Sequence, residues 1–166
     1  MSKDNGRAGR GGDKETFMRC IIQRVTNAKV SVDNKAIGQI EQGIMVLVGV
    51  AESDDAKTFE YMAGKLVHLR IFTDENDKMN LSTADIDGGI LLVPNFTLYG
   101  DAHQGRRPSY TKGAPPSVAA DIFAGFVECV KAQYDKVECG EFGAHMHVEL
   151  LNDGPVTIMI DSDKVF

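Results

Sequence analysis

The apolar run at residues 43–51 constrains the fold of this chain more than any other feature. It reads Gly-Ile-Met-Val-Leu-Val-Gly-Val-Ala and contains no polar side chain. A strand with one face in water alternates apolar and polar residues, whereas a strand covered on both faces is apolar throughout. We therefore expect a central strand here, with other elements packed against both of its faces.

Several other segments have the pattern of strands. Residues 18–26 are rich in β-branched side chains, and residues 28–33 alternate apolar with polar side chains, which indicates a half-buried strand. The turn at 33–35 returns the chain as a hairpin partner over 36–41. Shorter strands are predicted at 90–93, where Pro94 ends the ladder because proline has no N–H to donate, and at 146–150 and 156–160.

Two segments have helical periodicity. The first covers 54–70 with Ser53 as its N-cap, and the second opens at Pro115-Pro116-Ser117. The apolar face of the first contains Phe59, Met62, Ala63, Leu66 and Val67, and the ridges of the second contain Val118, Ala119, Ile122, Phe123, Phe126, Val127 and Val130. The order of elements predicts an α/β fold, with a mixed, largely antiparallel, barrel-like sheet and two main packing helices.

Length and composition indicate one domain. The chain has 166 residues, enough for one substantial core, and no apolar run long enough to span a membrane. Residues 1–17 contain four glycines and seven charged residues, so we expect a disordered extension or a cloning remnant before a domain at 18–166. Three cysteines, Cys20, Cys129 and Cys139, have no metal-like spacing and indicate reduced thiols in the cytoplasm.

The net charge narrows the range of partners. A formal charge of −6 argues against broad binding to nucleic acid, DNA included. It is compatible with a protein that binds only the end of a nucleic acid through a local basic patch. Arg106, Arg107 and Lys112 are the candidates for that patch, and arginine suits bidentate contact with phosphate. A solvated loop is the alternative interpretation.

Two motifs interrupt apolar runs and are candidates for a site. At 93–100, Val-Pro-Asn-Phe-Thr-Leu-Tyr-Gly either continues as a sheet edge or breaks to present backbone amides and the Thr97 hydroxyl at a cleft. Such amides stabilise the oxyanion in acyl transfer. At 152–157, Asn-Asp-Gly-Pro-Val-Thr contains Gly154-Pro155, which is either an ordinary tight turn or a cis bond. The residues alone leave both choices open.

Metal and thiol chemistry are weaker interpretations. His145 and His147 lie two apart on one predicted strand face, but no third ligand has suitable spacing, so we expect no metal and no cofactor. A thiol hydrolase would need a reactive cysteine. Cys20 lies in an apolar strand and Cys129 beside apolar helix ridges, which is typical of buried structural cysteine.

From Met18 to about Asp161 the chain resembles the D-aminoacyl-tRNA deacylases. No single stretch is specific, but the set is specific in this order and spacing. The matching stretches are Gln23-Arg24-Val25, Leu69-Arg70-Ile71-Phe72, Lys78-Met79-Asn80-Leu81-Ser82, Phe96-Thr97-Leu98-Tyr99-Gly100-Asp101, Gly105-Arg106-Arg107-Pro108-Ser109, Phe142-Gly143-Ala144 and Asn152 to Thr157.

The resemblance implies an activity. It implies a hydrolase that cleaves the ester between the 3′ end of tRNA and a D-amino acid, or glycine mischarged on tRNA for alanine. In the family the 2′-OH of the terminal adenosine assists, without a metal or a covalent intermediate. The resemblance carries the site to Pro94, Asn95, Phe96 and Thr97, and we expect tRNA contact at Arg106 and Arg107.

The resemblance also implies an assembly. It implies a homodimer in which Gly154-Pro155 is cis and projects into the partner's site beside Phe96 and Thr97. There it would reject L-amino acids sterically and so proofread chirality in translation. Arg24 matches the arginine that holds this turn. No membrane or DNA partner is implied.

One departure from the family's pattern opens alternatives. The family usually has Ser-Gln where this chain has Pro94-Asn95. A related animal branch also has proline there, with a trans Gly-Pro bond and relaxed chirality, so an editor of L-aminoacyl-tRNA is one alternative. A catalytically silent module that binds RNA ends is another. Because Phe-Thr-Leu and Asn-Asp-Gly-Pro-Val-Thr are kept, we favour the D-specific group.

Overall fold

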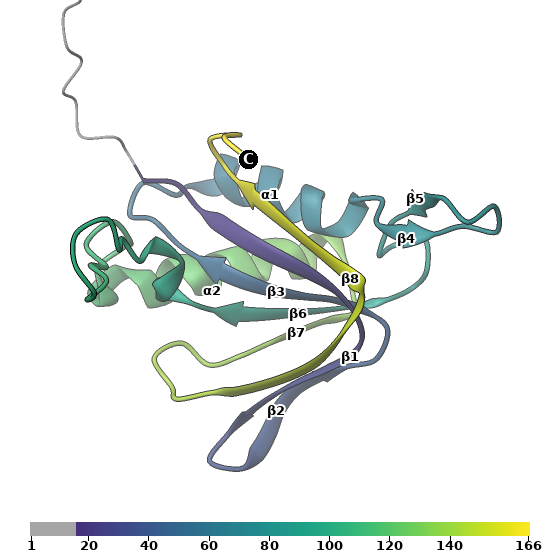
Figure 1. Cartoon of the computed structure of the whole chain (residues 1–166), viewed down its shortest axis with the longest axis horizontal. Coiled ribbons are helices and arrows are strands. Elements are labelled where there is room, and N and C mark those ends of the chain that lie inside the picture. The colour runs from purple at the N-terminus through teal and green to yellow at the C-terminus, as the bar shows by residue number, and fades with distance from the viewer. Residues whose placement is uncertain (1–15) are drawn as a thin grey trace, which may run out of the picture.

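The computed structural model describes residues 16–166, which form a curled sheet with two helices packed on one side (Figure 1). No helix in this part of the chain is long and apolar enough to cross a membrane. The strands are β1 (Arg19–Val32), β2 (Lys35–Ile40), β3 (Gly43–Gly49), β4 (Phe72–Thr73), β5 (Met79–Leu81), β6 (Gly89–Pro94), β7 (Val137–Cys139) and β8 (His147–Asp161). The helices are α1 (Ala56–His68), the 3-10 helix η1 (Phe96–Tyr99) and α2 (Pro116–Gln133).

The main sheet has six strands in the order β2-β1-β3-β6-β7, with β8 paired to the other edge of β1. The pairs of β1 with β2, β3 and β8 are antiparallel, while β3–β6 and β6–β7 are parallel. The sheet almost closes, because a Cβ at Gly38 of β2 would lie 3.1 Å from the carbonyl oxygen of Cys139 in β7. The predicted mixed, largely antiparallel, barrel-like sheet is confirmed.

The two longest strands differ from the prediction. The segments at 18–26 and 28–33 are one strand, β1, whose pairing with β8 shifts register between Gln23 and Asn27. The segments at 146–150 and 156–160 are likewise one strand, β8, in which residues 153–156 form no pair with β1. Separate strands were the wrong prediction, because a bulge bends a strand without ending it.

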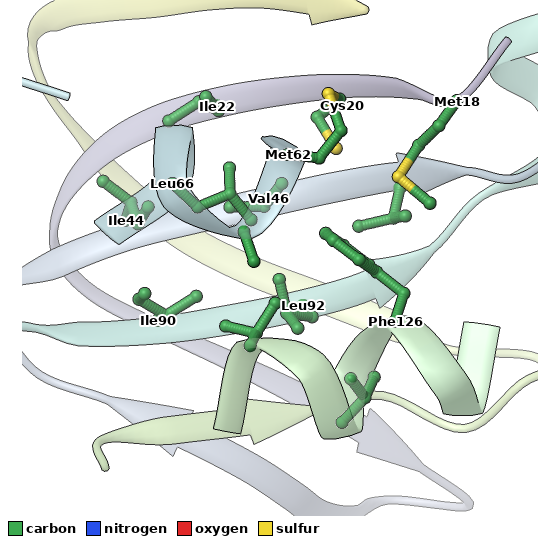
Figure 2. Packing of buried hydrophobic residues seen from close by; sticks show 14 of the residues in the cluster. Met18, Cys20, Ile22, Ile44, Val46, Met62, Leu66, Ile90, Leu92 and Phe126 are labelled. Carbon is green, nitrogen blue, oxygen red and sulfur yellow. The ribbon is translucent and has the colours of Figure 1, made fainter. Parts of the chain in front are cut away.

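The sheet core confirms the central position of the run at 43–51. On one face of β3, Ile44 and Val46 pack with Met62 and Leu66 of α1 and with Phe126 of α2 (Figure 2). On the opposite face Met45 belongs to a second buried cluster, which contains Val25, Ala28, Val30, Ile40, Leu91 and Val93. Both helices therefore cover one face, and the curl of the sheet itself covers the other.

The N-cap of α1 differs from the prediction. Asp55, not Ser53, is the N-cap of α1, since its carboxylate accepts a hydrogen bond from the Thr58 N–H at 3.0 Å. The Ser53 hydroxyl instead donates to the carbonyl oxygen of Thr16 at 3.0 Å. Of the extension predicted at 1–17, only Thr16 and Phe17 lie among the described residues. Their carbonyl oxygens accept hydrogen bonds from Ser53 and Tyr99, so contacts with the domain begin before residue 18.

Candidate active site

A cleft of about 1040 Å³ opens where β3 and β6 end side by side. The first turns of α2 and the segment before β8 form its other walls. Its lining is mainly apolar and includes Pro94, Asn95, Phe96, Thr97, Tyr110, Phe123 and Phe142. The motif at 94–97 therefore lies at a cleft, and all four residues predicted there contribute to its wall.

Local chemistry turns this motif into a 3-10 helix rather than a sheet edge. Pro94 is the last residue of β6 to pair with β3, and the Asn95 N–H closes the ladder on the carbonyl of Val48 at 2.8 Å. The Asn95 side-chain oxygen then accepts from the Thr97 N–H at 3.2 Å and from the Thr97 hydroxyl. Asn95 thus serves as the cap of η1.

These bonds leave one backbone donor free at the cleft. The N–H groups of Asn95 and Thr97 are both occupied, whereas the N–H of Phe96 has no acceptor among residues 16–166. The Thr97 hydroxyl is bonded only to Asn95 in this part of the chain, with no base beside it. A covalent role for Thr97 therefore has no chemical support.

The outer rim of the cleft is aromatic. The Phe96 side chain is 61% exposed and meets Tyr110 edge to face, with 5.2 Å between ring centroids. Sequence reasoning missed Tyr110 as a site residue. The sequence feature that could have identified it is that Tyr110 is the only Phe, Tyr or Trp in the polar loop at 100–113.

The basic loop lies beside the cleft. Its base is closed by two backbone bonds between Asp101 and Ser109, at 2.7 and 2.8 Å, and by a contact of 3.4 Å between the Asp101 carboxylate and Lys112. Hydrogen bonds from the backbone N–H and ring of His103 lower the pKa of Asp101 to about 2, so it stays ionised. Arg106 and Arg107 are exposed at the tip, and neither makes an ion pair or side-chain hydrogen bond with the described residues.

The turn at Gly154-Pro155 is exposed to solvent, and neighbouring side chains bind its backbone. Its peptide bond is cis, as the resemblance implies for the D-specific group. Gly154 has φ of +123°, and a Cβ there would lie 2.8 Å from both the Arg24 guanidinium and the Val156 side chain. The Asn152 amide donates at 3.0 Å to the carbonyls of Arg24 and Val156 and so closes the turn. Only glycine fits at position 154.

Arg24 joins this turn to a neighbouring segment. Its Nε donates to the Asp153 carbonyl at 3.2 Å and lies 3.3 Å from the Asp153 carboxylate. Its Nη1 donates to the Ile71 carbonyl at 2.8 Å, and its side chain is only 11% exposed. The structure therefore places Arg24 where it can hold the turn, while its effect on activity stays a prediction.

The bend in the middle of β8 and the end of β6 lie at opposite ends of the sheet in one chain (Figure 1), and the cleft opens at the end of β6. Asn152 is in register with Val25, Val25 with Gly43, and Gly43 with Gly89. Pro94 is five residues further along β6, which is about 17 Å at the rise of a strand. One chain therefore does not bring the two motifs together.

Comparison with known proteins identifies the family. The family model for D-Tyr-tRNA(Tyr) deacylase matches residues 21–161. The chain belongs to this family. A D-aminoacyl-tRNA deacylase of Thermosipho africanus is 56% identical over 149 residues, which is 90% of this chain and 100% of that protein. Members of this deacylase family are hydrolases.

Two solved structures share the fold. The first, titled c-Myc DNA Unwinding Element Binding Protein, has a TM-score of 0.80 and 36% identity, and covers 86% of this chain and 97% of its own. The second, a probable eukaryotic D-amino acid tRNA deacylase, has a TM-score of 0.76 and 20% identity, and covers 88% of this chain and 100% of its own. At 20% identity, the similarity to the second structure shows only that the two proteins share a fold.

The cysteines and histidines offer no competing site for a deacylase. Cys20 is fully buried, and burial raises the pKa of the Cys20 and Cys129 thiols, so neither is a ready thiolate. No cysteine lines the cleft. The rings of His145 and His147 lie 5.2 Å apart, and only His145 reaches the cleft. Residues 16–166 hold no group of three or more potential metal ligands.

Proposed function

We propose that this protein hydrolyses the ester that joins a D-amino acid to the 3′ end of tRNA, and glycine mischarged on tRNA for alanine, in the cytoplasm. Family membership supports the reaction class. The observation that carries the mechanism is the free Phe96 N–H at the edge of a largely apolar cleft.

In the proposed step, water attacks the ester carbonyl and the developing oxyanion accepts a hydrogen bond from the Phe96 N–H. The bond between the carbonyl carbon and the ribose oxygen then breaks, and the proton lost by the attacking water ends on that oxygen, which leaves as the free hydroxyl of the tRNA. Of the amides between Asn95 and Thr97, this is the one without an internal partner. A preoriented donor in a site with little water stabilises the transition state more than it would in bulk solvent. Pro94, which replaces the family's serine, leaves this donor in place, so the proposed step does not use the missing hydroxyl.

We further propose that the chirality filter acts between two copies of the chain. Gly154 and Pro155 are exposed, and Arg24 and Asn152 hold the turn rigidly from beneath. A rigid, exposed turn is suited to insertion into another molecule. Leu151 and Met159 on the same strand are 57% and 52% exposed, an apolar surface that a second copy would cover. In the homodimer, each turn would narrow the partner's cleft beside Phe96.

The acceptor end of the tRNA would lie along the loop at 100–113. Arg106 and Arg107 project from it beside the cleft, and both guanidinium groups are available for phosphate. This local contact suits a protein of net charge −6. The proposal includes no DNA or membrane partner.

Deacylation of D-Tyr-tRNA and L-Tyr-tRNA by the purified protein tests the reaction. We expect rapid cleavage of the D-ester and slow cleavage of the L-ester. Equal cleavage would support the relaxed editor of L-aminoacyl-tRNA that Pro94 suggests. Cleavage of neither, even with enzyme in excess, would support the silent RNA-end binding module.

The oxyanion donor is tested by Phe96→Pro and Phe96→Ala. Proline fits the first position of a helix, and it lacks both the phenyl ring and the N–H, whereas alanine lacks only the ring. The difference between the two variants therefore isolates the N–H, and Asn95 before this position already has an extended backbone, with φ −147° and ψ 94°. We expect F96P to lose about 10²–10³-fold in kcat. F96A keeps the N–H and should mainly raise KM. Equal kcat in the two variants would contradict the proposed donor.

The cross-subunit filter is tested by mixing G154A, which should cleave the D- and L-esters with little selectivity, with an excess of F96P, which should cleave both slowly. If each turn serves the partner's cleft, a mixed dimer contains one cleft with an intact Phe96 and an intact opposing turn, so selectivity for the D-ester returns. If turn and cleft act within one chain, the mixture stays as unselective as G154A. Each variant assayed alone is the control.

A further inference from the structure

The helix η1, whose first two residues form the edge of the cleft, has only one buried residue. Phe96 and Thr97 are exposed, Leu98 is half-buried, and Tyr99 is the only buried residue of the four. The position of the Phe96–Thr97 edge therefore depends on what anchors Tyr99 and on what binds the remaining carbonyls of the helix.

Tyr99 is packed against two glycines from different elements. A Cβ added at Gly49, the end of β3, would lie 2.8 Å from the Tyr99 ring, and so would one added at Gly113, in the segment before α2. The ring therefore lies directly on the backbone of both glycines, with 1% of the residue exposed. Substitution by a smaller side chain would leave a cavity between the sheet and the cleft wall.

The hydroxyl of Tyr99 reaches the segment before β1. It donates a hydrogen bond of 2.6 Å to the carbonyl oxygen of Phe17. Burial raises the pKa of Tyr99 above its usual value, so the hydroxyl remains a protonated donor at any ordinary pH. Phe17 is followed by Met18, which is fully buried and whose N–H donates to the Asp54 carboxylate at 3.1 Å. The acceptor is thus itself fixed.

Arg19 provides the second link. Its Nη1 donates at 3.1 Å to the carbonyl oxygen of Leu98, in the last turn of η1. The guanidinium also lies over the Tyr99 ring, with Cζ 5.1 Å from the ring centroid, in cation–π geometry. One side chain from β1 therefore touches both of the last two residues of η1.

We propose that Tyr99 and Arg19 are positioning residues, which hold the Phe96–Thr97 edge of the cleft in place by tying η1 to β1 and the segment at 16–18. This inference rests on the proposed function for its effect on catalysis. The effect of Tyr99 and Arg19 on the order of the segment at 94–100 does not depend on that function. Neither residue touches the reacting atoms.

Amide hydrogen exchange of residues 94–100 tests the inference without any substrate. Tyr99→Phe keeps the ring between the glycines and removes only the hydroxyl, and Arg19→Met keeps the apolar stem and removes the donor. We expect each to raise exchange in this segment at least about fivefold, since each removes one partly buried hydrogen bond. Arg19→Lys keeps a charged donor and should restore most of the protection.

Tyr134→Phe is the matched control. The Tyr134 hydroxyl also donates to a backbone carbonyl, that of Gly88, but it lies after the far end of α2, a helix of 18 residues and about 27 Å. Y134F should leave exchange at 94–100 unchanged. Unchanged exchange at 94–100 in both Y99F and R19M would overturn the inference, whatever the activity of the protein.

Kinetics with D-Tyr-tRNA then separate the inference from the proposed function. We expect Y99F and R19M to lower kcat about tenfold with KM almost unchanged, because the misplaced edge affects the transition state more than substrate binding. Y134F should keep the wild-type kcat. If exchange rises in the variants but the wild-type protein has no deacylase activity, the positioning role stands and the proposed function is refuted. Faster exchange with unchanged kcat in an active enzyme would overturn the catalytic part of the inference.

Discussion

Arg24 offers the sharpest test of how the exposed turn is held. Its guanidinium donates to two backbone carbonyls, those of Asp153 and Ile71, from a side chain that is 11% exposed. Hydrogen bonds from a charged group contribute roughly 1.5–3 kcal/mol each. The ion pair with Asp153 adds less than about 1 kcal/mol, since that carboxylate is 45% exposed.

We therefore expect Arg24→Ala to lower the free energy of unfolding by at least about 3 kcal/mol, measured by urea denaturation. Lysine has one ammonium group and reaches only one of the two carbonyls, so Arg24→Lys should lose about half as much. Arg70→Ala is the control, because Arg70 is exposed and its only side-chain hydrogen bond among the described residues is a long one, 3.5 Å to Asn80. Its effect should stay within about 0.5 kcal/mol.

The same variants should alter chirality selection. With the turn less firmly held, the ratio of kcat/KM for D-Tyr-tRNA to that for L-Tyr-tRNA should fall about tenfold in R24A and less in R24K. R70A should keep the wild-type ratio. An R24A protein with the wild-type urea midpoint and the wild-type ratio would refute the reasoning that these bonds hold the turn.

Two further predictions concern stability around the start of α1. Burial raises the pKa of Asp54 to about 6, although hydrogen bonds from the N–H groups of Ala51 and Met18 lower it. Because the folded-state pKa lies above the unfolded value, its stabilising contribution is present below about pH 4 and is lost as pH rises through 6. Relative to Asp54→Asn, the unfolding free energy of the wild type should fall by about 2 kcal/mol across this range, and a rise would contradict the assignment. For the helix cap, Asp55→Ala should cost about 1 kcal/mol, since it removes the acceptor for the Thr58 N–H. Ser53→Ala should cost less than about 0.5 kcal/mol, and the reverse order in urea denaturation would restore Ser53 as the cap.

Much of the fold could be predicted from local pattern. The uninterrupted apolar run at 43–51 requires cover on both faces, and the structure supplies helices on one side and the curl of the sheet on the other. The cap of α1 was misplaced because Ser53 and Asp55 are both good caps in sequence. In the folded chain the Asp55 carboxylate accepts from the Thr58 N–H, while the Ser53 hydroxyl donates to the carbonyl of Thr16. The joining of two predicted strands into β1 was also missed, because pairing with β8 across a bulge keeps it continuous.

The candidate site was predictable as a set of residues but not as chemistry. The motif at 94–97 named the residues at the cleft, yet it gave no sign that the Asn95 side chain would cap η1 and leave only the Phe96 N–H free. Tyr110 was missed because nothing in the loop at 100–113 says that its ring will meet Phe96. Arg24 entered only through resemblance, since its carbonyl partners Asp153 and Ile71 lie 129 and 47 residues away in sequence.

By itself, the sequence determined the family, the order of strands and helices, and the residues of the two motifs, because ordered motifs and hydrophobic periodicity are local properties of the chain. Tertiary contacts decided which backbone N–H at 95–97 has no partner among the described residues, what anchors η1, and that one chain keeps Gly154-Pro155 at the far end of the sheet from Phe96. These depend on hydrogen bonds and packing between residues distant in sequence, and such contacts exist only once the sheet has curled.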